Sequence, residues 1–434
     1  MLPQWVIEKK RDGQPLSAGD IRSFIQDYAQ GRIPDYQMAA LAMAIYFRGM
    51  SFEEVAALTD AMMRSGALVD TSAISLPKVD KHSTGGIGDK VSLVLAPLVA
   101  CCDVAVPMLS GRGLGITGGT LDKLESIPGY RTRLGVPEFL RILGACGCSI
   151  MGQTADLVPA DRKLYALRDV TGTVPSIPLI SASIMSKKLA EGADALVLDV
   201  KWGRGAFMKS VADARELART MVEIGRRMNR GMTAVLTDMN QPLGRTAGNA
   251  LEIREAVEAL KGNGPDDLMT LTMELAGHML VLARRAPSLG EAGDLLRRQL
   301  RSGAAYERFC RMVRLHGGDA KVLENTDLLP TARSKQDLPS PAAGCVADVD
   351  AERIGRACVA LGAGRARVED AVDPAVGVSG IVKVGERVDC GEPLLTLHAN
   401  DPAKLEEARR LLEGAFRVAE MPEPPLPLIV EVIR

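Results

Sequence analysis

Aromatic residues make up only 3% of the 434-residue chain. That scarcity argues against a surface on which the bases of a single-stranded nucleic acid stack. An excess of charge of one sign is also missing, because the formal net charge is −1 and no long run of lysine or arginine occurs. A polyanion therefore has no basic patch to bind, and we expect no nucleic-acid partner.

Long hydrophobic runs are absent as well. The longest apolar stretch, residues 91–102, ends at Asp103 and is shorter than the ~20 residues that a membrane span needs. The segment from Met1 to Lys10 lacks the apolar centre of a signal peptide. We therefore expect a cytoplasmic protein without a membrane partner.

Metal-binding and disulfide patterns are missing too. The eight cysteines include no Cys-x-x-Cys pair, and the four histidines are scattered without the spacing of metal ligands. In a chain of this length such cysteines are expected to be reduced and mostly buried. The sequence also contains no Gly-Lys dipeptide, which excludes a Walker loop.

Glycine, by contrast, is concentrated in two places. Residues 110–125 read Ser-Gly-Arg-Gly-Leu-Gly-Ile-Thr-Gly-Gly-Thr-Leu-Asp-Lys-Leu-Glu, and residues 81–89 read Lys-His-Ser-Thr-Gly-Gly-Ile-Gly-Asp. Glycines let backbone N–H groups approach a ligand, while Ser, Thr and Lys add hydrogen bonds and positive charge. Two such loops, each leading into a helical pattern, predict a site for a small oxyanion such as phosphate.

Residues 113–118, within the 110–125 cluster, also fit the Gly-x-Gly-x-x-Gly pattern of dinucleotide-binding folds. That fingerprint requires an acidic residue about 20 positions later, at the end of the next strand. No strand ends suitably here, so the pattern is weak support for a dinucleotide site. Tight turns are the structural alternative for either cluster alone.

The length allows more than one core, since single cores stop growing near ~250–300 residues. Helical patterns at residues 17–30, 35–49 and 51–66 open the chain, the third with a Ser-x-x-Glu capping box. Short β-branched runs then alternate with helical stretches, which predicts a mostly parallel sheet with helices on its faces. The expected strands are residues 104–109, 196–200 and 234–236, and the expected helices are residues 91–102, 137–146 and 212–229.

The remaining segments predict two further units. Residues 161–192 are helical, with turns at 171–174 and around Pro178, and could rejoin the N-terminal helices. Residues 264–328 are helical again, and a smaller α+β unit follows the break at 339–341 with strands at 344–349, 380–388 and 393–398. Residues 380–395 have the spacing of a lipoyl hairpin but lack its modified lysine, so a structural role is expected.

The glycine clusters carry a family resemblance. Residues 110–125, together with 81–86, resemble the thymidine and pyrimidine-nucleoside phosphorylases. The resemblance implies an α/β homodimer in which a small all-helical domain is hinged to a large mixed α/β domain. The helical domain would span 1–66 and 160–192, the α/β domain 70–156 and 195–335, and a C-terminal α+β subdomain 342–434. The likeness continues through residues 155–161, 165–171, 176–192, 201–208, 237–255 and 362–367.

In this family inorganic phosphate is the co-substrate, and it displaces the base from C1′ of a pyrimidine nucleoside. The products are the free base and an α-sugar 1-phosphate, and no organic cofactor takes part. One ammonium and several hydroxyls suit a phosphate dianion that must remain nucleophilic. By match to the family, the phosphate-binding residues are Lys81, Ser83, Ser92, Ser110 and Thr120.

The resemblance assigns the base site to the helical domain. Arg168, Ser183 and Lys187 match the pyrimidine-binding residues, and Arg168 and Lys187 would stabilise negative charge on the departing base. His82 would face the base as a hydrogen-bond donor or acid. Without the family match, a solvated Ser–Lys helix pair and a structural histidine are the ordinary alternatives. The expected pocket walls are Tyr165, Ile180 and Phe207, with Met108 near the sugar.

This chain departs from its relatives at several positions. Ile116 stands where most relatives carry His, and Arg204 replaces a usual Ser. Some relatives hold potassium at positions that correspond to Gly88, Leu243, Thr246 and Glu255. Position 90, a hydroxyl residue in those members, is Lys90 here, and its ammonium could take the place of the potassium ion.

The sequence leaves alternatives for the preferred nucleoside and for the class of reaction. Met108 is typical of thymidine-preferring relatives, while residues 241–244 resemble the broad-specificity branch; we expect thymidine and 2′-deoxyuridine to be preferred. The rival enzymes are an anthranilate-type phosphoribosyltransferase and a nucleotide-monophosphate phosphorylase, whose members carry an additional N-terminal domain. A non-catalytic protein on the same scaffold is the remaining alternative. Phosphate and base sites on separate domains imply closure about hinges near 66–70, 157–161 and 192–194.

Overall fold

The computed structural model describes residues 2–113, 115–154, 156–365, 370–421 and 424–434. Leu114, Ala155 and residues 366–367 of the family-like segments lie outside the described residues. The chain begins with helices α1 (Pro3–Arg11), α2 (Ala18–Ala29), α3 (Asp35–Arg48) and α4 (Phe52–Met63).

Local capping explains where these helices begin. Ser17 and Ser51 each accept a hydrogen bond from the third helical backbone N–H, and Asp20 and Glu54 complete the two capping boxes. The predicted helix starts are therefore confirmed, although α4 ends at Met63 rather than near Gly66. Helix α1 was not predicted, because its N-cap position forms no side-chain capping bond and its sequence is largely polar.

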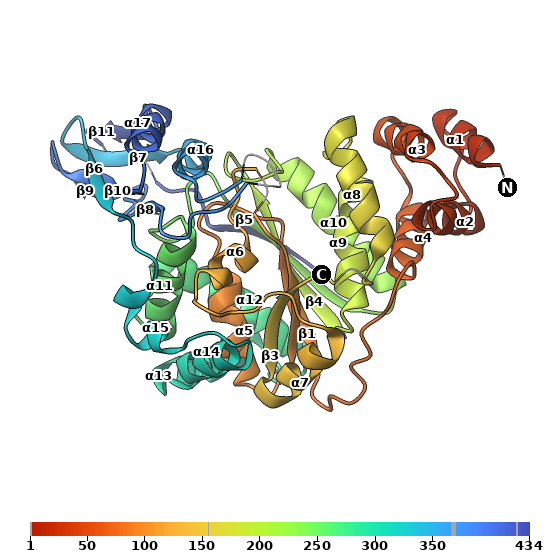
Figure 1. Cartoon of the computed structure of the whole chain (residues 1–434), viewed down its shortest axis with the longest axis horizontal. Coiled ribbons are helices and arrows are strands. Elements are labelled where there is room, and N and C mark those ends of the chain that lie inside the picture. Colours follow the sequence, from red (N-terminus) through yellow and green to blue (C-terminus); the bar gives the residue numbers. More distant parts are fainter. Residues whose placement is uncertain (1, 114, 155, 366–369, 422–423) are drawn as a thin grey trace.

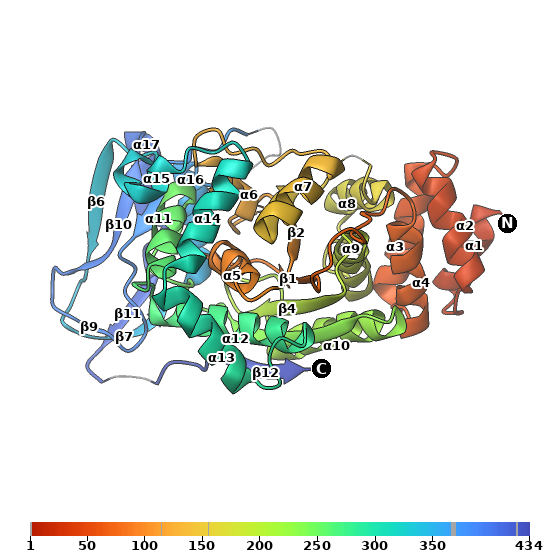
Figure 2. The same ribbon diagram turned by 90° about the horizontal axis from the view of Figure 1, so that it is seen from below.

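Helices α8 (Pro159–Thr171) and α9 (Ile177–Ala190) rejoin the N-terminal helices, as predicted. Together they form a helical unit at one end of the molecule (Figures 1 and 2). Its buried apolar core includes Phe24, Leu58 and Leu179, and it continues onto helix α10 (Val211–Arg227). The helical unit is therefore packed against the large domain as well as within itself.

The large domain is organised around a sheet with the order β1-β4-β5-β12. Its strands are β1 (Val79–Ser83), β4 (Ala195–Trp202), β5 (Gly231–Asp238) and β12 (Ile429–Ile433). Strands β1, β4 and β5 are parallel, as the sequence predicts. A parallel pair, β2 (Val106–Ser110) and β3 (Cys148–Gly152), lies beside β1 through the bridge between Lys78 and Ala105.

Helices cover both faces of this sheet, and alternation along the strands separates two cores. Val197 and Val235 belong to the core that contains helices α5 and α11 to α14. Leu198 and Leu236 belong to the core that contains α10 and the helical unit. The covering helices are α5 (Val91–Ala100), α6 (Thr120–Glu125), α7 (Val136–Cys146), α11 (Asn249–Leu260), α12 (Asp266–Leu282), α13 (Leu289–Arg301), α14 (Ala304–Leu315), α15 (Lys321–Glu324) and a 3₁₀ turn at Thr326–Leu328.

The C-terminal unit lies at the opposite end from the helical unit (Figures 1 and 2). It contains two three-stranded sheets, ordered β6-β10-β8 and β11-β7-β9. The elements are β6 (Ser334–Pro339), β7 (Gly344–Val349), α16 (Ala351–Leu361), β8 (Gly377–Ser379), β9 (Arg387–Val388), β10 (Pro393–Ala399), α17 (Pro402–Leu411) and β11 (Phe416–Ala419).

Long-range strand pairing changes the limits expected for this unit. β6 precedes the 339–341 break yet pairs with β10, and β12 leaves the unit to pair antiparallel with β5. The expected limits of 342–434 thus miss one strand and include one that belongs to the main sheet. The strand expected at 380–388 is mostly loop, with only Arg387–Val388 paired. The predicted fold class, an α/β protein with a helical domain and a C-terminal α+β unit, is confirmed.

Candidate active site

Two of the predicted phosphate-binding residues, Ser83 and Ser110, lie at the carboxyl ends of parallel strands. β1 ends at Ser83, β2 at Ser110, and β4 pairs with β1 so that Ser83 faces Asp199. The bridge between Lys78 and Ala105 places the start of β2 beside the start of β1. Ligands of open α/β sheets bind at this edge, where the parallel strands end.

Alternation along β1 sends its side chains to opposite faces. Lys81 lies toward the core that holds α5, where its ammonium is 3.6 Å from Asp199 Oδ2 and 3.9 Å from Asp89 Oδ1. His82 lies toward α9: burial lowers its pKa well below the usual value, and Lys188 and Lys187 lower it further. The His82 imidazole is therefore neutral at pH 7.

Lys81 is the feature of this edge that most clearly needs a ligand. Its side chain is 0% exposed, and its Nζ has no hydrogen-bond partner among the described residues. A buried ammonium group that lacks acceptors is costly. An anion between the two glycine loops would supply those acceptors.

Charged residues that the sequence analysis did not select surround this ammonium. Lys201, at the end of β4, is fully buried with its Nζ 2.9 Å from Asp199 Oδ2. Burial would raise the pKa of Asp89, but Lys201, Lys81 and Lys123 lower it far below the usual value. The sequence feature that could have identified these residues is a pair of charged residues, Asp199 and Lys201, inside an otherwise apolar strand.

The first glycine loop is held by its own polar side chains. Ser83 Oγ donates a hydrogen bond of 2.5 Å to Asp89 Oδ2 and accepts one of 3.1 Å from the Gly85 N–H. Helix α5 follows directly, with Ser92 in its first turn. The predicted residues Lys81, Ser83 and Ser92 thus belong to one strand–loop–helix segment.

The second glycine loop folds closely onto itself. Gly113 N–H donates to Asp122 Oδ2 at 2.7 Å, and a Cβ on Gly119 would lie only 2.0 Å from the Gly113 nitrogen. This loop leads into α6, whose first residue is Thr120. The buried Lys123 then ties α6 to the first loop, because its Nζ donates to Asp89 O at 2.6 Å.

The base-site residues of α9 form a polar group at the edge of the helical unit. Lys187 Nζ forms an ion pair with Asp161 and donates to Ser183 Oγ at 2.8 Å. Its side chain is 26% exposed. The predicted Ser183–Lys187 helix-face pair is present, with Asp161 of α8 as the additional partner.

Arg168 is buried in the last turn of α8, and its side chain faces the connection to α9. Its guanidinium donates to the carbonyl oxygens of Thr173 at 3.3 Å, Leu179 at 3.1 Å and Val174 at 2.5 Å. Burial lowers the pKa of this guanidinium. Arg168 therefore organises the start of α9, which carries Ser183 and Lys187.

The expected pocket walls differ in their surroundings. Tyr165 and Ile180 are half-buried on α8 and α9. Phe207 is 44% exposed, and its Cε2 lies 3.8 Å from where a Cβ on Gly85 would be. Met108 is only 1% exposed and packs within the main hydrophobic core.

The residues that correspond to the potassium ligands surround an ammonium group here. Lys90 Nζ donates to Leu243 O at 3.1 Å, to Thr246 O at 2.9 Å and to Glu255. A Cβ on Gly88 would lie 2.4 Å from Leu243 O, so the backbone is also tightly packed. This oxygen set does not fit potassium in addition to Lys90. No group of three or more His, Cys, Asp or Glu residues that could hold a metal ion occurs in the described chain.

Two other departures from the family pattern contact the C-terminal unit. Ile116 packs near α16, since a Cβ on Gly355 would lie 3.1 Å from Ile116 Cβ. Arg204 forms two hydrogen bonds with the carboxylate of Asp348, at 2.8 and 2.6 Å. These contacts connect two segments to the C-terminal unit: the second glycine loop and the loop between β4 and α10, which contains Arg204 and Phe207.

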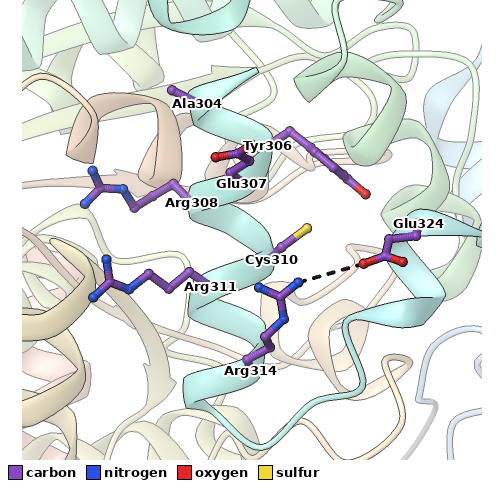
Figure 3. Close-up of a pocket in the computed structure, with 8 residues that line it drawn as sticks. All are labelled: Ala304, Tyr306, Glu307, Arg308, Cys310, Arg311, Arg314 and Glu324. Carbon is purple, nitrogen blue, oxygen red and sulfur yellow. Dashed lines mark ion pairs between the residues drawn. The ribbon is translucent and has the colours of Figure 1, made fainter. Parts of the chain in front are cut away.

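A hollow of about 600 Å³ lies elsewhere, along one side of α14 (Figure 3). Arg308, Arg311 and Arg314 project from this helix, and Arg314 lies 3.8 Å from Glu324. None of the predicted site residues lines this hollow. This hollow is therefore separate from the candidate site at the strand ends.

Comparisons with known proteins match all three parts of the chain. Models described as the helical bundle domain and the a/b domain of a glycosyl transferase family match residues 4–66 and 75–306. A model described as the pyrimidine nucleoside phosphorylase C-terminal domain matches residues 345–419.

Similar proteins include anthranilate phosphoribosyltransferase from Thermus thermophilus, whose structure matches with a TM-score of 0.59 at 21% identity. That match covers 72% of this chain and 99% of the other, and it concerns the fold alone. The pyrimidine-nucleoside phosphorylase of Bacillus subtilis is 50% identical over 97% of both chains. That of Staphylococcus haemolyticus is 52% identical over 91% of both chains. The chain therefore belongs to the pyrimidine-nucleoside phosphorylase family.

Proposed function

We propose that this protein is a pentosyltransferase that catalyses the reversible phosphorolysis of pyrimidine nucleosides. The observation that carries the proposal is the buried Lys81 ammonium beside the glycine loop that follows β1, because its Nζ has no hydrogen-bond partner within the part of the chain that the structure describes. Phosphate bound there is the nucleophile. Its hydrogen-bond donors would be Lys81 and the hydroxyls of Ser83, Ser92, Ser110 and Thr120.

In the proposed reaction a phosphate oxygen forms a bond to C1′ while the bond from C1′ to the base nitrogen breaks. The bonding electron pair leaves with the base, which finally takes up a proton. Lys187 and Arg168 are cations that would stabilise the charge on the base, with Ser183 as a hydrogen-bond partner. His82, which is neutral, would contribute a hydrogen bond to the base rather than a charge.

Inorganic phosphate is the co-substrate in this proposal, and no organic cofactor takes part. We also propose that the enzyme needs no potassium ion. Burial opposes the charge on Lys90, but Glu255 and Glu252 raise the pKa of this ammonium above its usual value. Lys90 therefore supplies a permanent positive charge to the oxygens of Leu243, Thr246 and Glu255.

The finer proposals concern substrate preference and assembly. Met108 on β2 supports a preference for thymidine and 2′-deoxyuridine over uridine.

Exposed aromatic side chains on the helical unit support a homodimer, because large exposed apolar patches are typical of protein interfaces. We further propose that the enzyme acts in cytoplasmic pyrimidine salvage; no helix in the described residues is long and apolar enough to cross a membrane. The exposed aromatic residues of the helical unit are Trp5, Tyr36, Tyr46, Phe47 and Phe52, of which Tyr46 and Phe47 are in ring contact.

The homodimer is tested with Phe47→Glu, since Phe47 is 75% exposed on α3. Light scattering should report a dimer for the parent and a larger monomer fraction for the variant. Leu328→Glu, which alters a similarly exposed apolar residue far from α3, is the matched control. A monomeric parent would contradict the assembly.

The activity is tested by phosphate-dependent release of uracil or thymine from nucleosides. Lys81→Met should lower kcat/KM by roughly 10²–10³-fold, the worth of one preorganised donor. Lys78→Met is the matched control, because Lys78 is on the same chain segment but forms its ion pair with Asp194, at 3.1 Å. Transfer of the phosphoribosyl group from phosphoribosyl pyrophosphate to anthranilate, with release of pyrophosphate and without phosphate-dependent release of a pyrimidine base, would identify the rival transferase.

A further inference from the structure

A buried charged cluster joins the helical unit to the strands of the candidate site. Its side chains are Asp80 on β1, which is 0% exposed, and Lys188 (3%) and Glu191 (0%) at the end of α9. Lys188 Nζ donates to Asp80, to Leu109 O on β2 at 2.7 Å and to Glu191 Oε2 at 3.2 Å. All three ammonium hydrogens thus have an acceptor.

The cluster fixes α9 to both strands through a second contact. The Leu109 N–H donates to Glu191 Oε2 at 3.2 Å, so both backbone polar groups of Leu109 bond to side chains of the α9 segment. In the chain, Asp80 directly precedes Lys81, Leu109 directly precedes Ser110, and Lys188 directly follows Lys187. Each anchoring residue is therefore adjacent to a predicted phosphate-binding or base-binding residue.

Counting hydrogens within the cluster reveals a missing donor. Asp80 Oδ1 and Glu191 Oε1 are buried and have no hydrogen-bond partner among the described residues. Two carboxylates and one ammonium would also leave a net negative charge in a site without water contact. One proton held between the two carboxyl groups satisfies both oxygens and makes the cluster neutral. Burial, and then the charge of Asp80, raise the pKa of Glu191 well above its usual value, which identifies Glu191 as the proton carrier.

We propose that Lys188 is a positioning residue: with Asp80 and a protonated Glu191 it forms a neutral clamp that sets α9 against the ends of β1 and β2. The clamp fixes the distance between Lys187 and Ser183 on one side and Lys81, His82 and Ser110 on the other. The proposal rests on the proposed phosphorolysis, because it concerns how the base and phosphate sites are held in register. The three clamp residues themselves contact neither substrate.

Three single variants test the clamp. Glu191→Gln retains the shape of a protonated acid, so it should keep kcat and the melting temperature close to parental values. Asp80→Asn removes the ion pair between Lys188 and β1 and leaves Lys188 with Glu191 of its own helix segment, at 3.2 Å, as its carboxyl partner. Lys188→Met removes both the ion pair and the bond to Leu109. Each of these two should lower kcat by about tenfold to 10²-fold, the effect expected of a misplacement near 1 Å.

The readouts separate positioning from stability. Binding of inorganic phosphate alone, measured by calorimetry on folded Lys188→Met, should remain near parental affinity while kcat falls. A purely structural role would lower only the melting temperature and leave kcat unchanged at 25 °C. If Lys188→Met does not fold, Glu191→Ala serves instead, because it keeps the Lys188–Asp80 pair and loses the bond to the Leu109 N–H. Parental kcat in the folded variant would overturn the positioning role.

The shared proton has its own readout, which does not depend on activity. The infrared spectrum of the parent minus that of Glu191→Gln should contain the carbonyl stretch of a protonated carboxylic acid at pH 7. Absence of that band, or a Glu191→Gln variant as damaged as Asp80→Asn, would overturn the neutral clamp. If the parent catalyses no phosphorolysis, the proposed function fails, while the band and the contrast in stability still test the clamp.

Discussion

Lys90 forms an ion pair with Glu255 inside the protein, and both side chains are at least nine-tenths buried. The same ammonium also contacts carbonyl oxygens of Leu243 and Thr246. The parent enzyme should therefore have equal kcat in potassium, sodium and choline chloride at constant ionic strength. A requirement for potassium in the parent would contradict the role of Lys90.

The variant Lys90→Ser removes the ammonium group from these oxygens and places a hydroxyl side chain at position 90. It leaves Glu255 buried without its counter-charge, which should cost about 3–5 kcal/mol of unfolding free energy. Potassium chloride, more than choline chloride, should restore part of the melting temperature, because the remaining oxygens are again open to a cation. Lys261→Ser removes a more exposed ion pair, with Glu258, and should change stability little.

Lys187 offers the cleanest test of the base site. Its side chain is partly exposed, and among the described residues its ammonium bonds to two side chains, Asp161 and Ser183. Lys187→Met should lower kcat/KM by roughly 10²–10³-fold, because one cation that meets the leaving base is lost. Lys163→Met, which breaks a weaker pair with Asp35 on the same helical unit, should retain activity.

Arg168 acts on both structure and charge. Arg168→Ala removes three hydrogen bonds to backbone carbonyls as well as a cation. We therefore expect a fall in both melting temperature and kcat, whereas Lys187→Met should mainly lower kcat. Near-parental turnover of either variant on a good nucleoside would contradict the base-site assignment.

Patterns within short stretches of sequence predicted many of the helices and strands, but they do not predict contacts between segments that are far apart in the chain. Ser17 and Ser51 mark helix starts because the capping hydrogen bonds form between near neighbours in sequence. The pairing of β12 with β5 joins segments nearly 200 residues apart, and no local pattern indicates it. For the same reason the glycine loops predicted a phosphate site, but the clamp formed by Asp80, Lys188 and Glu191 was not visible in the sequence.

The expected hinge segment 66–70 is hydrogen-bonded to residues that lie next to the other two expected hinges, and Ala67 also forms a bridge with Leu157. Ala67 N–H donates to Asp156 O at 2.9 Å, and Val69 N–H donates to Ala190 O at 2.9 Å. We predict that the enzyme with phosphate and a base analogue has a smaller radius of gyration in solution scattering than the ligand-free enzyme. Equal radii in the two states would count against closure.

Gly66 lies within this hinge and offers a direct perturbation. A Cβ there would be 2.2 Å from Asp156 O and 2.5 Å from Pro159 Cδ, so Gly66→Ala must displace the crossing segments. The ligand-induced change in radius and kcat should both decrease. Gly144→Ala, in helix α7, meets no atom within 4 Å and should leave both unchanged.

Buried histidines predict a loss of stability in acid. Burial lowers the pKa of His316 to about 4, below its usual 6.5, while the imidazole bonds to Ser149 and Arg131 O. As pH falls below 6.5 the unfolded chain binds a proton that folded His316 does not, so unfolding free energy decreases between pH 6.5 and 4. The contribution is at most about 3 kcal/mol. Denaturant titrations of His316→Gln should have a shallower pH slope than the parent.

Met108 carries the prediction on sugar specificity. The structure adds that Met108 is buried in the main hydrophobic core, toward which Lys81 also lies. A thioether offers the sugar's 2′-hydroxyl only a weak acceptor, and an unpaired hydroxyl costs ~1–3 kcal/mol, or about one to two powers of ten in specificity. The parent should therefore have higher kcat/KM for thymidine and 2′-deoxyuridine than for uridine.

Met108→Lys should narrow this gap, because an ammonium at position 108 would reach the phosphate or the 2′-hydroxyl. Met108→Leu keeps an apolar side chain and should preserve the preference. Met151→Lys is the control for burying a lysine, since Met151 is buried on β3 in a separate cluster. It should lower stability without changing the ratio of kcat/KM for uridine to that for 2′-deoxyuridine. A parent that uses uridine and 2′-deoxyuridine equally well would instead belong to the broad-specificity branch that residues 241–244 resemble.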